Sequence, residues 1–430
     1  MRTQRMRGVL VGATALAALG AGVGVAPGAG AADGTRGGAR DTGHSAAQAA
    51  LDAQVAEYGA PGALAQARDK HGVWNGRAGV ADLTTQRPRG KDDHFRAGSI
   101  NKTFVATVLL QLRAEGKVDL DATVDTYLPG VVRGNGHDGR RITVRQLLNH
   151  TSGIYNYTAD QEFRADHLEI GFLEHRYDTL TPQQLLAFAL RHEPDFAPGT
   201  DWNYSNTNYV LAGLIIEKVT GSPYATEVQR RILGPLKLRD TSFPGTGSRL
   251  PRPHGRAYSK LSTDPKAPIH DVTRLNPSVA WASGEVVTTT ADLNRFYVAL
   301  LRGHLLPAAE LAQMKTTVPV ADGVPLRYGL GLMEWRLSCG TTVWGHDGGI
   351  HGSASYAFAD EGADHSIALN LNGDYAGDGS MVVDAEFCGV TDGGAAKGLG
   401  KGGEDRAGSV RLGSELNELG APKAPATPRS

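Results

Sequence analysis

The sequence has 430 residues, of which 40% are hydrophobic and 21% are charged. This balance is typical of a folded globular protein and excludes a fibrous or wholly disordered chain. Lys and Arg total 44 against 45 for Asp and Glu. The protein therefore has no net positive charge to favour binding of nucleic acid or an anionic membrane surface.

Residues 1–31 have the pattern of a secretory signal peptide. Arg2, Arg5 and Arg7 precede an uncharged stretch, and Ala29-Gly30-Ala31 supplies the small residues at which signal peptidases cut. A membrane anchor is the alternative, but the stretch is rich in Gly and Ala and only weakly apolar. We expect cleavage near Ala31 and a secreted, extracellular protein without a stable membrane anchor.

The sequence contains two cysteines, Cys339 and Cys388. In an oxidising compartment an isolated pair is most simply one disulfide. Two unrelated buried thiols are the alternative.

The elements expected after the leader begin with a disordered segment over residues 32–45 and a helix over 46–58. Short apolar runs divided by turn residues predict an antiparallel hairpin over residues 62–80. A helix is expected to begin beside Ser99, because apolar residues then follow at helical spacing, and to stop at Gly116.

The remaining segments change character twice. Residues 120–271 predict helices and long loops, with the clearest helical periodicities at 144–148, 182–190 and 209–219. Strand signals return at 343–344, 354–358 and 367–372. Beyond residue 390 the Gly-, Ala-, Lys- and Pro-rich composition predicts a flexible tail over 391–430.

This order predicts an α/β fold, with an antiparallel sheet flanked by helices. Strands stand before and after a helical middle, which indicates one discontinuous α/β domain over residues 46–119 and 272–390. Residues 120–271 then form an all-helical insertion domain.

Three short clusters carry candidate chemistry, and the first is Ser99-Ile100-Asn101-Lys102. Three-residue spacing on a helix places the hydroxyl and the ammonium on one face, where Lys102 accepts the seryl proton if burial lowers its pKa. The helix N-terminus also favours an oxyanion near the Ser99 amide. Alone, the pattern fits equally a Ser helix cap with a solvated Lys.

The second cluster is Tyr204-Ser205-Asn206, just before an apolar helix. A phenol beside a nucleophile can pass a proton to a leaving group, and the amide two residues later can hold a substrate carbonyl. A helix-capping loop is the alternative.

The third cluster is His346-Asp347-Gly348-Gly349, which follows an apolar run expected at a strand edge. Glycines there permit close approach of a substrate to the backbone, and a strand amide can complete an oxyanion hole with that of Ser99. A Gly-rich turn with a structural His is the alternative.

Together, and in this order, the clusters resemble the motifs of the penicillin-recognising serine hydrolases: Ser-x-x-Lys, Tyr-x-Asn and a Lys- or His-x-Gly triplet. This family includes class C β-lactamases, DD-peptidases, esterases and D-aminopeptidases. The resemblance covers about residues 47–390 and implies a β-lactamase/DD-peptidase-like fold. Supporting stretches are residues 147–153, 198–199, 282–284 and 289–293.

The resemblance implies a role for each motif residue. Ser99 is expected as the nucleophile, Lys102 as its base, Tyr204 as the proton shuttle and Asn206 as a carbonyl-holding group. The expected reaction is acyl transfer through a covalent serine ester, without a metal or cofactor.

Further binding roles follow from the same resemblance. His346 is expected to tune the Tyr204 and Lys102 protons electrostatically. The amides of Ser99 and Gly349 are expected to form the oxyanion hole. Gly348 and Trp281 are the other expected substrate-binding residues, with Trp281 as a pocket wall.

Within the family, the chain is most similar to secreted D-alanyl-D-alanine carboxypeptidases with a His in the third motif and a similarly placed Cys pair. A peptidoglycan-type peptide or a β-lactam is therefore the expected small-molecule partner, and the chain is expected to be a monomer. Alternatives are a class C-like β-lactamase, an esterase or D-aminopeptidase of the same family, and a non-catalytic binding module.

One departure from the family pattern bears on the substrate. Asp347 and Gly349 stand where Thr is often found, and a carboxypeptidase must recognise a C-terminal carboxylate. At about 4 Å and an effective dielectric near 20, two like charges repel by roughly 4 kcal/mol. An outward-facing Asp347 or a nearby cation, for which Arg336 is the candidate, would remove this repulsion.

Overall fold

The computed structural model describes residues 43–389. The expected signal peptide over residues 1–31 and the tail over 391–430 lie outside the described residues. Within the described range, no helix is long and apolar enough to cross a membrane.

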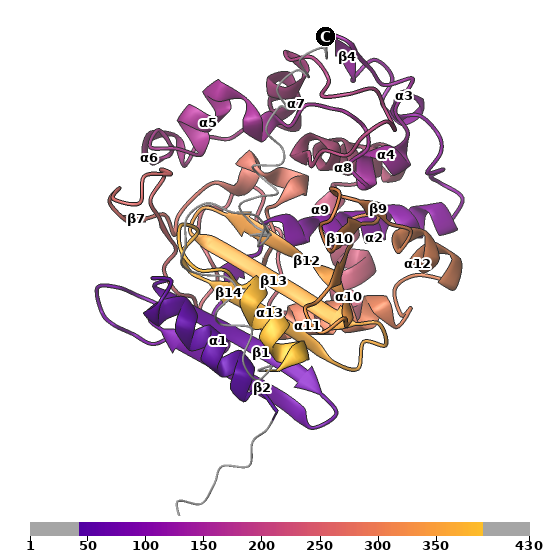
Figure 1. The fold of residues 1–430 in the computed structure, drawn as a ribbon. Helices are drawn as coiled ribbons and strands as arrows, with labels where there is room; N and C mark the ends of the chain where they lie inside the picture. Colours follow the sequence, from indigo (N-terminus) through magenta and orange to yellow (C-terminus); the bar gives the residue numbers. More distant parts are fainter. Residues whose placement is uncertain (1–42, 390–430) are drawn as a thin grey trace, which may run out of the picture. The chain divides into compact units, whose positions relative to one another are not determined.

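The central element is an eight-stranded antiparallel sheet in the order β2-β1-β14-β13-β12-β11-β10-β9 (Figure 1). Its strands are β1 Gly62–Asp69, β2 Gly72–Gly79, β9 Val318–Pro319, β10 Leu326–Tyr328, β11 Met333–Arg336, β12 Thr342–Ile350, β13 Ser353–Asp360 and β14 Ser366–Leu371. The hairpin expected over residues 62–80 is β1 and β2. The antiparallel sheet flanked by helices is confirmed.

Most helices lie between the two groups of strands. They are α1 Ser45–Ala56, α2 Asn101–Ala114, α3 Val124–Tyr127, α4 Val144–Leu148, α5 Gln161–His167, α6 Phe172–His175, α7 Pro182–Leu190, α8 Asn206–Thr220, α9 Tyr224–Val228, α10 Gly234–Leu236, α11 Thr290–Leu301, α12 Ala308–Met314 and α13 Ser380–Cys388.

Three pairs of two-residue strands complete the described fold: β3 Phe95–Arg96 with β8 Val287–Thr288, β4 Arg133–Gly134 with β5 His137–Asp138, and β6 Tyr258–Ser259 with β7 His270–Asp271. Two of these pairs lie within residues 120–271. The sequence led us to expect an all-helical segment over residues 120–271. The two strand pairs show that this segment also contains short strands.

Both faces of the sheet are apolar, and each covers its own core. Along β13, Tyr356 and Phe358 pack in the core shared with α1 and α13, whereas Ala357 and Ala359 join the core of α2, α8 and α11. This alternation follows from the two-residue period of a strand. The sheet is therefore a buried middle layer, with α1 and α13 on one face.

Local sequence signals explain where several helices begin. Thr143 and Thr181 each form a capping box, with Gln146 and Gln184 respectively, at the starts of α4 and α7. Each box satisfies two backbone donors that a helix start leaves unpaired. These two helices have the bounds that the hydrophobic periodicity predicts.

The helix that follows Ser99 is α2, and it is buried almost all the way round. Phe104 of α2 stacks on Phe296 of α11, with ring centroids 3.8 Å apart. A helix apolar on every side belongs in the interior of a domain. The candidate nucleophile therefore stands at the start of the central helix.

Cys339 and Cys388 form a disulfide. It joins the loop between β11 and β12 to the last residue of α13. The bridge therefore ties the end of the C-terminal helix to the sheet that carries His346.

Candidate active site

The nucleophile loop connects β3 to α2 and requires a glycine at residue 98. Gly98 has φ +53°, and a Cβ at this position would lie 2.6 Å from the Gly349 carbonyl oxygen. A side chain is therefore disfavoured both by the backbone conformation and by the close approach of β12. Asn101 fastens the start of α2, donating to the Ala282 carbonyl at 2.6 Å and accepting from the Val286 amide at 3.1 Å.

Lys102 is the second residue of α2, three residues after Ser99, and is fully buried. Its Nζ lies 2.9 Å from Ser99 Oγ and donates to Asn206 Oδ1 at 2.7 Å and to the Ser283 carbonyl at 2.8 Å, so a neutral amine keeps its lone pair for the Ser99 hydroxyl. Burial lowers the pKa of the Lys102 ammonium well below its usual value, although the Asp347 carboxylate opposes this change. A neutral amine beside the hydroxyl is what a general base for Ser99 requires.

Tyr204 lies in the loop before α8 and Asn206 is the first residue of that helix, and both reach the same cluster. Burial raises the pKa of the Tyr204 phenol well above its usual value, while its interaction with Ser99 lowers it. The phenol is therefore protonated at neutral pH and can pass on a proton. Its oxygen is buried and has no hydrogen bond of good geometry within the described residues.

Asn206 offers a donor towards a substrate. Its Oδ1 accepts from Lys102, while its Nδ2 donates to Thr158 Oγ1 at 3.3 Å. Because an amide nitrogen has two hydrogens, one remains for a substrate carbonyl. The Asn206 backbone amide is held by Asn156 Oδ1 at 3.1 Å.

The third motif lies on β12, just beyond the residues of that strand that pair with β11. β11 pairs with β12 only as far as Gly345, and beyond it this edge of β12 approaches the nucleophile loop. A Cβ on Gly348 would overlap the Ala97 carbonyl oxygen and lie 2.8 Å from the Ser99 amide nitrogen. Gly348 and Gly349 therefore lie directly against the loop, where the resemblance expects the oxyanion hole.

His346 is fully buried and faces Tyr328, with its Nε2 2.8 Å from the phenol oxygen. Within the described residues, no hydrogen bond joins it to Tyr204 or Lys102. Its expected electrostatic role stays a prediction.

Asp347 is only 2% exposed, so it does not face outward. Burial raises the pKa of its carboxyl, while the neighbouring His346 and Lys102 oppose the rise. Its Oδ2 has no hydrogen-bond partner within the described part of the chain. Asp347 is therefore a buried acidic group inside the cluster.

Arg336 does not compensate Asp347, contrary to the suggestion from the sequence. It is the exposed last residue of β11 and pairs with Thr342, at the opposite end of β12 from the motif. The expected place of Trp281 at a pocket wall stays a prediction. Its ring packs against Tyr224, with centroids 5.1 Å apart, and lies where a Cβ on Gly213 of α8 would meet it.

Three contributors were not assigned a role from the sequence. They are the Ser283 carbonyl that binds Lys102, Tyr328 beside His346, and His150, whose ring lies 4.3 Å from that of Tyr204. Ser283 and His150 lie in stretches that already resembled the family. Tyr328 lies on a three-residue strand that carried no signal.

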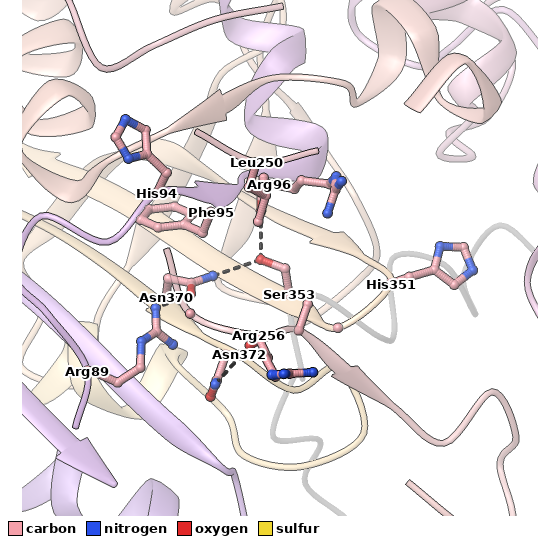
Figure 2. A pocket seen from close by; sticks show the side chains of 13 residues that line it. Arg89, His94, Phe95, Arg96, Leu250, Arg256, His351, Ser353, Asn370 and Asn372 are labelled. Carbon is pink, nitrogen blue, oxygen red and sulfur yellow. Dashed lines mark hydrogen bonds between the residues drawn. The ribbon is translucent and has the colours of Figure 1, made fainter. Parts of the chain in front are cut away.

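A separate polar cavity lies behind the nucleophile loop (Figure 2). Arg89 donates to Asn370 Oδ1 at 2.9 Å, Asn370 donates to Ser353 Oγ at 2.8 Å, and Ser353 donates to the Arg96 carbonyl at 2.6 Å. Neither Ser99, Lys102 nor Tyr204 lines this cavity. The cavity is therefore distinct from the candidate active site, although Ser353 in its lining holds the carbonyl of Arg96, three residues before Ser99.

Ser99 thus lies near the Lys102 amine, whose pKa is lowered, and near the protonated Tyr204 phenol. It precedes the first residue of α2 and faces the glycines of β12. Acyl transfer through a serine ester needs this arrangement. The fold and the site together define a serine hydrolase of the penicillin-recognising class.

Comparison with known proteins gives the family directly. The model of the Beta-lactamase family matches residues 47–386, so the chain belongs to this family. The protein named penicillin-binding protein 4 of Amycolatopsis lactamdurans is 30% identical over 358 residues, which cover 77% of this chain and 86% of that protein.

Two solved structures are also similar. A D-stereospecific amidohydrolase from Streptomyces sp. is 59% identical with a TM-score of 0.78, covering 81% of this chain and 99% of that chain. A D-amino acid amidase from Ochrobactrum anthropi SV3, complexed with L-phenylalanine amide, is 31% identical with a TM-score of 0.66, covering 76% and 90%.

Proposed function

We propose that this serine hydrolase is a D-stereospecific amidohydrolase, which cleaves amides and esters of D-amino acids that carry a free amino group. The observation that carries this proposal is the buried Asp347 carboxyl beside Lys102. The preference for D-amino acids rests on the similarity to the Streptomyces amidohydrolase.

The charge of Asp347 favours an ammonium over a carboxylate on the substrate. When Lys102 is neutral, the group left to balance the Asp347 anion in this cluster is His346, whose Nδ1 lies 3.5 Å from Asp347 Oδ1, since Arg336 lies at the far end of β12. A substrate carboxylate within about 6 Å, at an effective dielectric near 20, would be repelled by roughly 3 kcal/mol. A substrate ammonium would be attracted instead.

The proposed reaction follows from the site residues. Ser99 Oγ attacks the substrate carbonyl carbon while its proton passes to Lys102, and the amides of Ser99 and Gly349 stabilise the oxyanion. Tyr204 protonates the leaving nitrogen as the C–N bond breaks, and the amine or ammonia departs. Water then attacks the ester carbonyl while its proton passes to the Tyr204 phenolate. Lys102 returns its proton to Ser99 Oγ as the ester C–O bond breaks, which releases the D-amino acid and restores all three groups.

The test compares four substrates at equal concentration: D-phenylalanine amide, L-phenylalanine amide, N-acetyl-D-phenylalanine amide and a peptide ending in D-Ala-D-Ala. We expect the highest kcat/KM for D-phenylalanine amide and a loss of about tenfold or more on acetylation, because acetylation removes the ammonium. A preference for the D-Ala-D-Ala peptide would overturn the proposal. The Ser99→Ala variant serves as the inactive control.

A D-alanyl-D-alanine carboxypeptidase that β-lactams acylate is the second candidate, supported by the similarity to penicillin-binding protein 4. Benzylpenicillin separates the remaining activities. A lasting adduct on Ser99 is expected of a carboxypeptidase, and rapid loss of the antibiotic without an adduct is expected of a β-lactamase. An esterase without amidase activity would hydrolyse only the ester analogues.

We also propose that the protein is exported and cleaved near Ala31. The basic start, the apolar stretch and the small residues at 29–31 support this location, and the Cys339–Cys388 disulfide suits an oxidising compartment. N-terminal sequencing of protein from the culture medium should begin close to Ala32. Retention of the intact leader in the cytoplasm would contradict it.

A further inference from the structure

His150 is a buried residue that the reaction scheme above does not use. It directly follows Asn149, which caps the end of α4, and its φ of +64° places it in the left-handed region. Its side chain is fully buried. A residue other than glycine in this conformation is uncommon and is retained where the surroundings require it.

His150 accepts two hydrogen bonds, one from each residue that flanks Tyr204 in the sequence. The Asn203 amide donates to the His150 carbonyl at 3.1 Å, and the Ser205 amide donates to His150 Nδ1 at 3.2 Å. The left-handed backbone brings the carbonyl and the ring to the same loop. Tyr204 is therefore held between two anchors that belong to a single residue.

The ring of His150 also packs directly on the Tyr204 ring, with centroids 4.3 Å apart. Among the described residues the Tyr204 hydroxyl interacts with Ser99 but has no hydrogen bond of good geometry. Its position therefore depends strongly on backbone anchors and ring packing, and His150 contributes to both.

The hydrogen bonds also fix the protonation state of His150. Asn208 Oδ1 accepts from Ser152 Oγ at 2.7 Å, so the Asn208 amide turns its Nδ2 to His150 Nδ1 at 3.1 Å. With two donors directed at it, Nδ1 has no proton, and the neutral ring carries its proton on Nε2. Burial, with Lys102 and His346 nearby, lowers the His150 pKa well below its usual value.

We propose that His150 is a positioning residue that holds the Tyr204 phenol where it can protonate the leaving group. This inference rests on the proton-shuttle role of Tyr204 in the proposed function. His150 touches neither Ser99 nor the substrate and acts through Tyr204.

The role predicts a dependence on the leaving group. An amide nitrogen must be protonated as it departs, whereas nitrophenolate leaves without a proton. Loss of the anchor should therefore slow anilide hydrolysis and spare nitrophenyl ester hydrolysis. A merely structural role would slow both equally.

The experiment compares D-phenylalanine p-nitroanilide with p-nitrophenyl acetate. His150→Gly keeps the left-handed backbone but removes the ring, and we expect about a 100-fold lower kcat on the anilide, of the order measured when reacting groups are misplaced by about 1 Å. On the acetate we expect less than about a fivefold loss. His150→Asn should recover at least about tenfold on the anilide, because Asn tolerates positive φ and supplies an acceptor oxygen.

His137→Asn is the matched control, since His137 is another buried histidine in the described chain and neither of its ring nitrogens has a hydrogen-bond partner. Its kinetics should equal those of the wild type. If His150→Gly does not fold, His150→Gln replaces it. This variant should also lose more kcat on the anilide than on the acetate, with a smaller difference between the two losses. Equal losses on both substrates, or an unchanged anilide rate in a folded variant, would overturn the proposal.

The outcome is separable from that of the proposed function. If the wild-type protein cleaves no D-amino-acid anilide but is acylated by p-nitrophenyl acetate, the proposed substrate is wrong. Benzylpenicillin, whose ring nitrogen also needs a proton on opening, then replaces the anilide in the same comparison. The His150 variants should then lose more acylation rate with benzylpenicillin than with p-nitrophenyl acetate, which tests His150 independently of the proposed substrate.

Discussion

Gly348→Ala is expected to disable the site without unfolding the protein. The added methyl group would overlap the Ala97 carbonyl oxygen and lie 2.8 Å from the Ser99 amide nitrogen, whereas ordinary contacts begin at 3.4 Å. The Cβ would lie 2.0 Å from the Ala97 carbonyl oxygen, so β12 and the nucleophile loop must separate by about 1.4 Å to restore an ordinary contact of 3.4 Å. A displacement of this size at an oxyanion hole costs roughly 100-fold in rate, or about 2.7 kcal/mol.

The assay is kcat/KM for hydrolysis of p-nitrophenyl acetate, with thermal unfolding measured in parallel. Gly234→Ala on α10 is the matched control, because its nearest contact would be the Gln229 carbonyl oxygen at 3.3 Å, far from β12 in the sequence. We expect this control to keep wild-type activity. A folded Gly348→Ala variant with more than about half of the wild-type kcat/KM would refute the reasoning about close approach.

Three further predictions concern the nucleophile, its base and the disulfide. Ser99→Ala should fold normally and form no acyl adduct by intact mass, whereas an adduct would remove Ser99 from the mechanism. Asp347→Asn removes the anion that raises the Lys102 pKa, so the Lys102 amine should stay neutral at lower pH. The acid limb of the kcat/KM profile should therefore move to lower pH. A move to higher pH would contradict this. An unreduced digest should contain a peptide joining Cys339 to Cys388, and reduction should lower the free energy of unfolding by up to about 4 kcal/mol for a 49-residue separation; unchanged stability would contradict that contribution.

Local signals allowed much of the fold to be predicted from the sequence. Helices α4 and α7 have the expected bounds, because a capping threonine and a regular apolar period coincide there. The hairpin of β1 and β2 was also clear. By contrast, β9 and β10 have two and three residues, too few for alternation to be recognised.

The candidate site was predictable as a set of motifs but not as a geometry. Ser99 and Lys102 are close in sequence, so helical spacing already indicated their contact. The position of Asp347 depends on how β12 packs against the nucleophile loop, and the place of Arg336 depends on strand register. Such long-range relations leave no local pattern in the chain.

His150 shows the same limit from another side. Its position in a stretch that resembles the family was visible, but the two hydrogen bonds that flank Tyr204 join residues more than fifty positions apart. Tertiary packing determines them.

The pairing of β1 with β14 has a consequence for the order of events in the life of the chain. Ala63 is registered with Leu371, so the sheet brings together segments from opposite ends of the described sequence. A nascent chain that lacks its last strands can pair β1 only with β2, and it has no β12 against which Gly98 can pack. Assembly of the catalytic site therefore requires that β12 and β14 have already been synthesised.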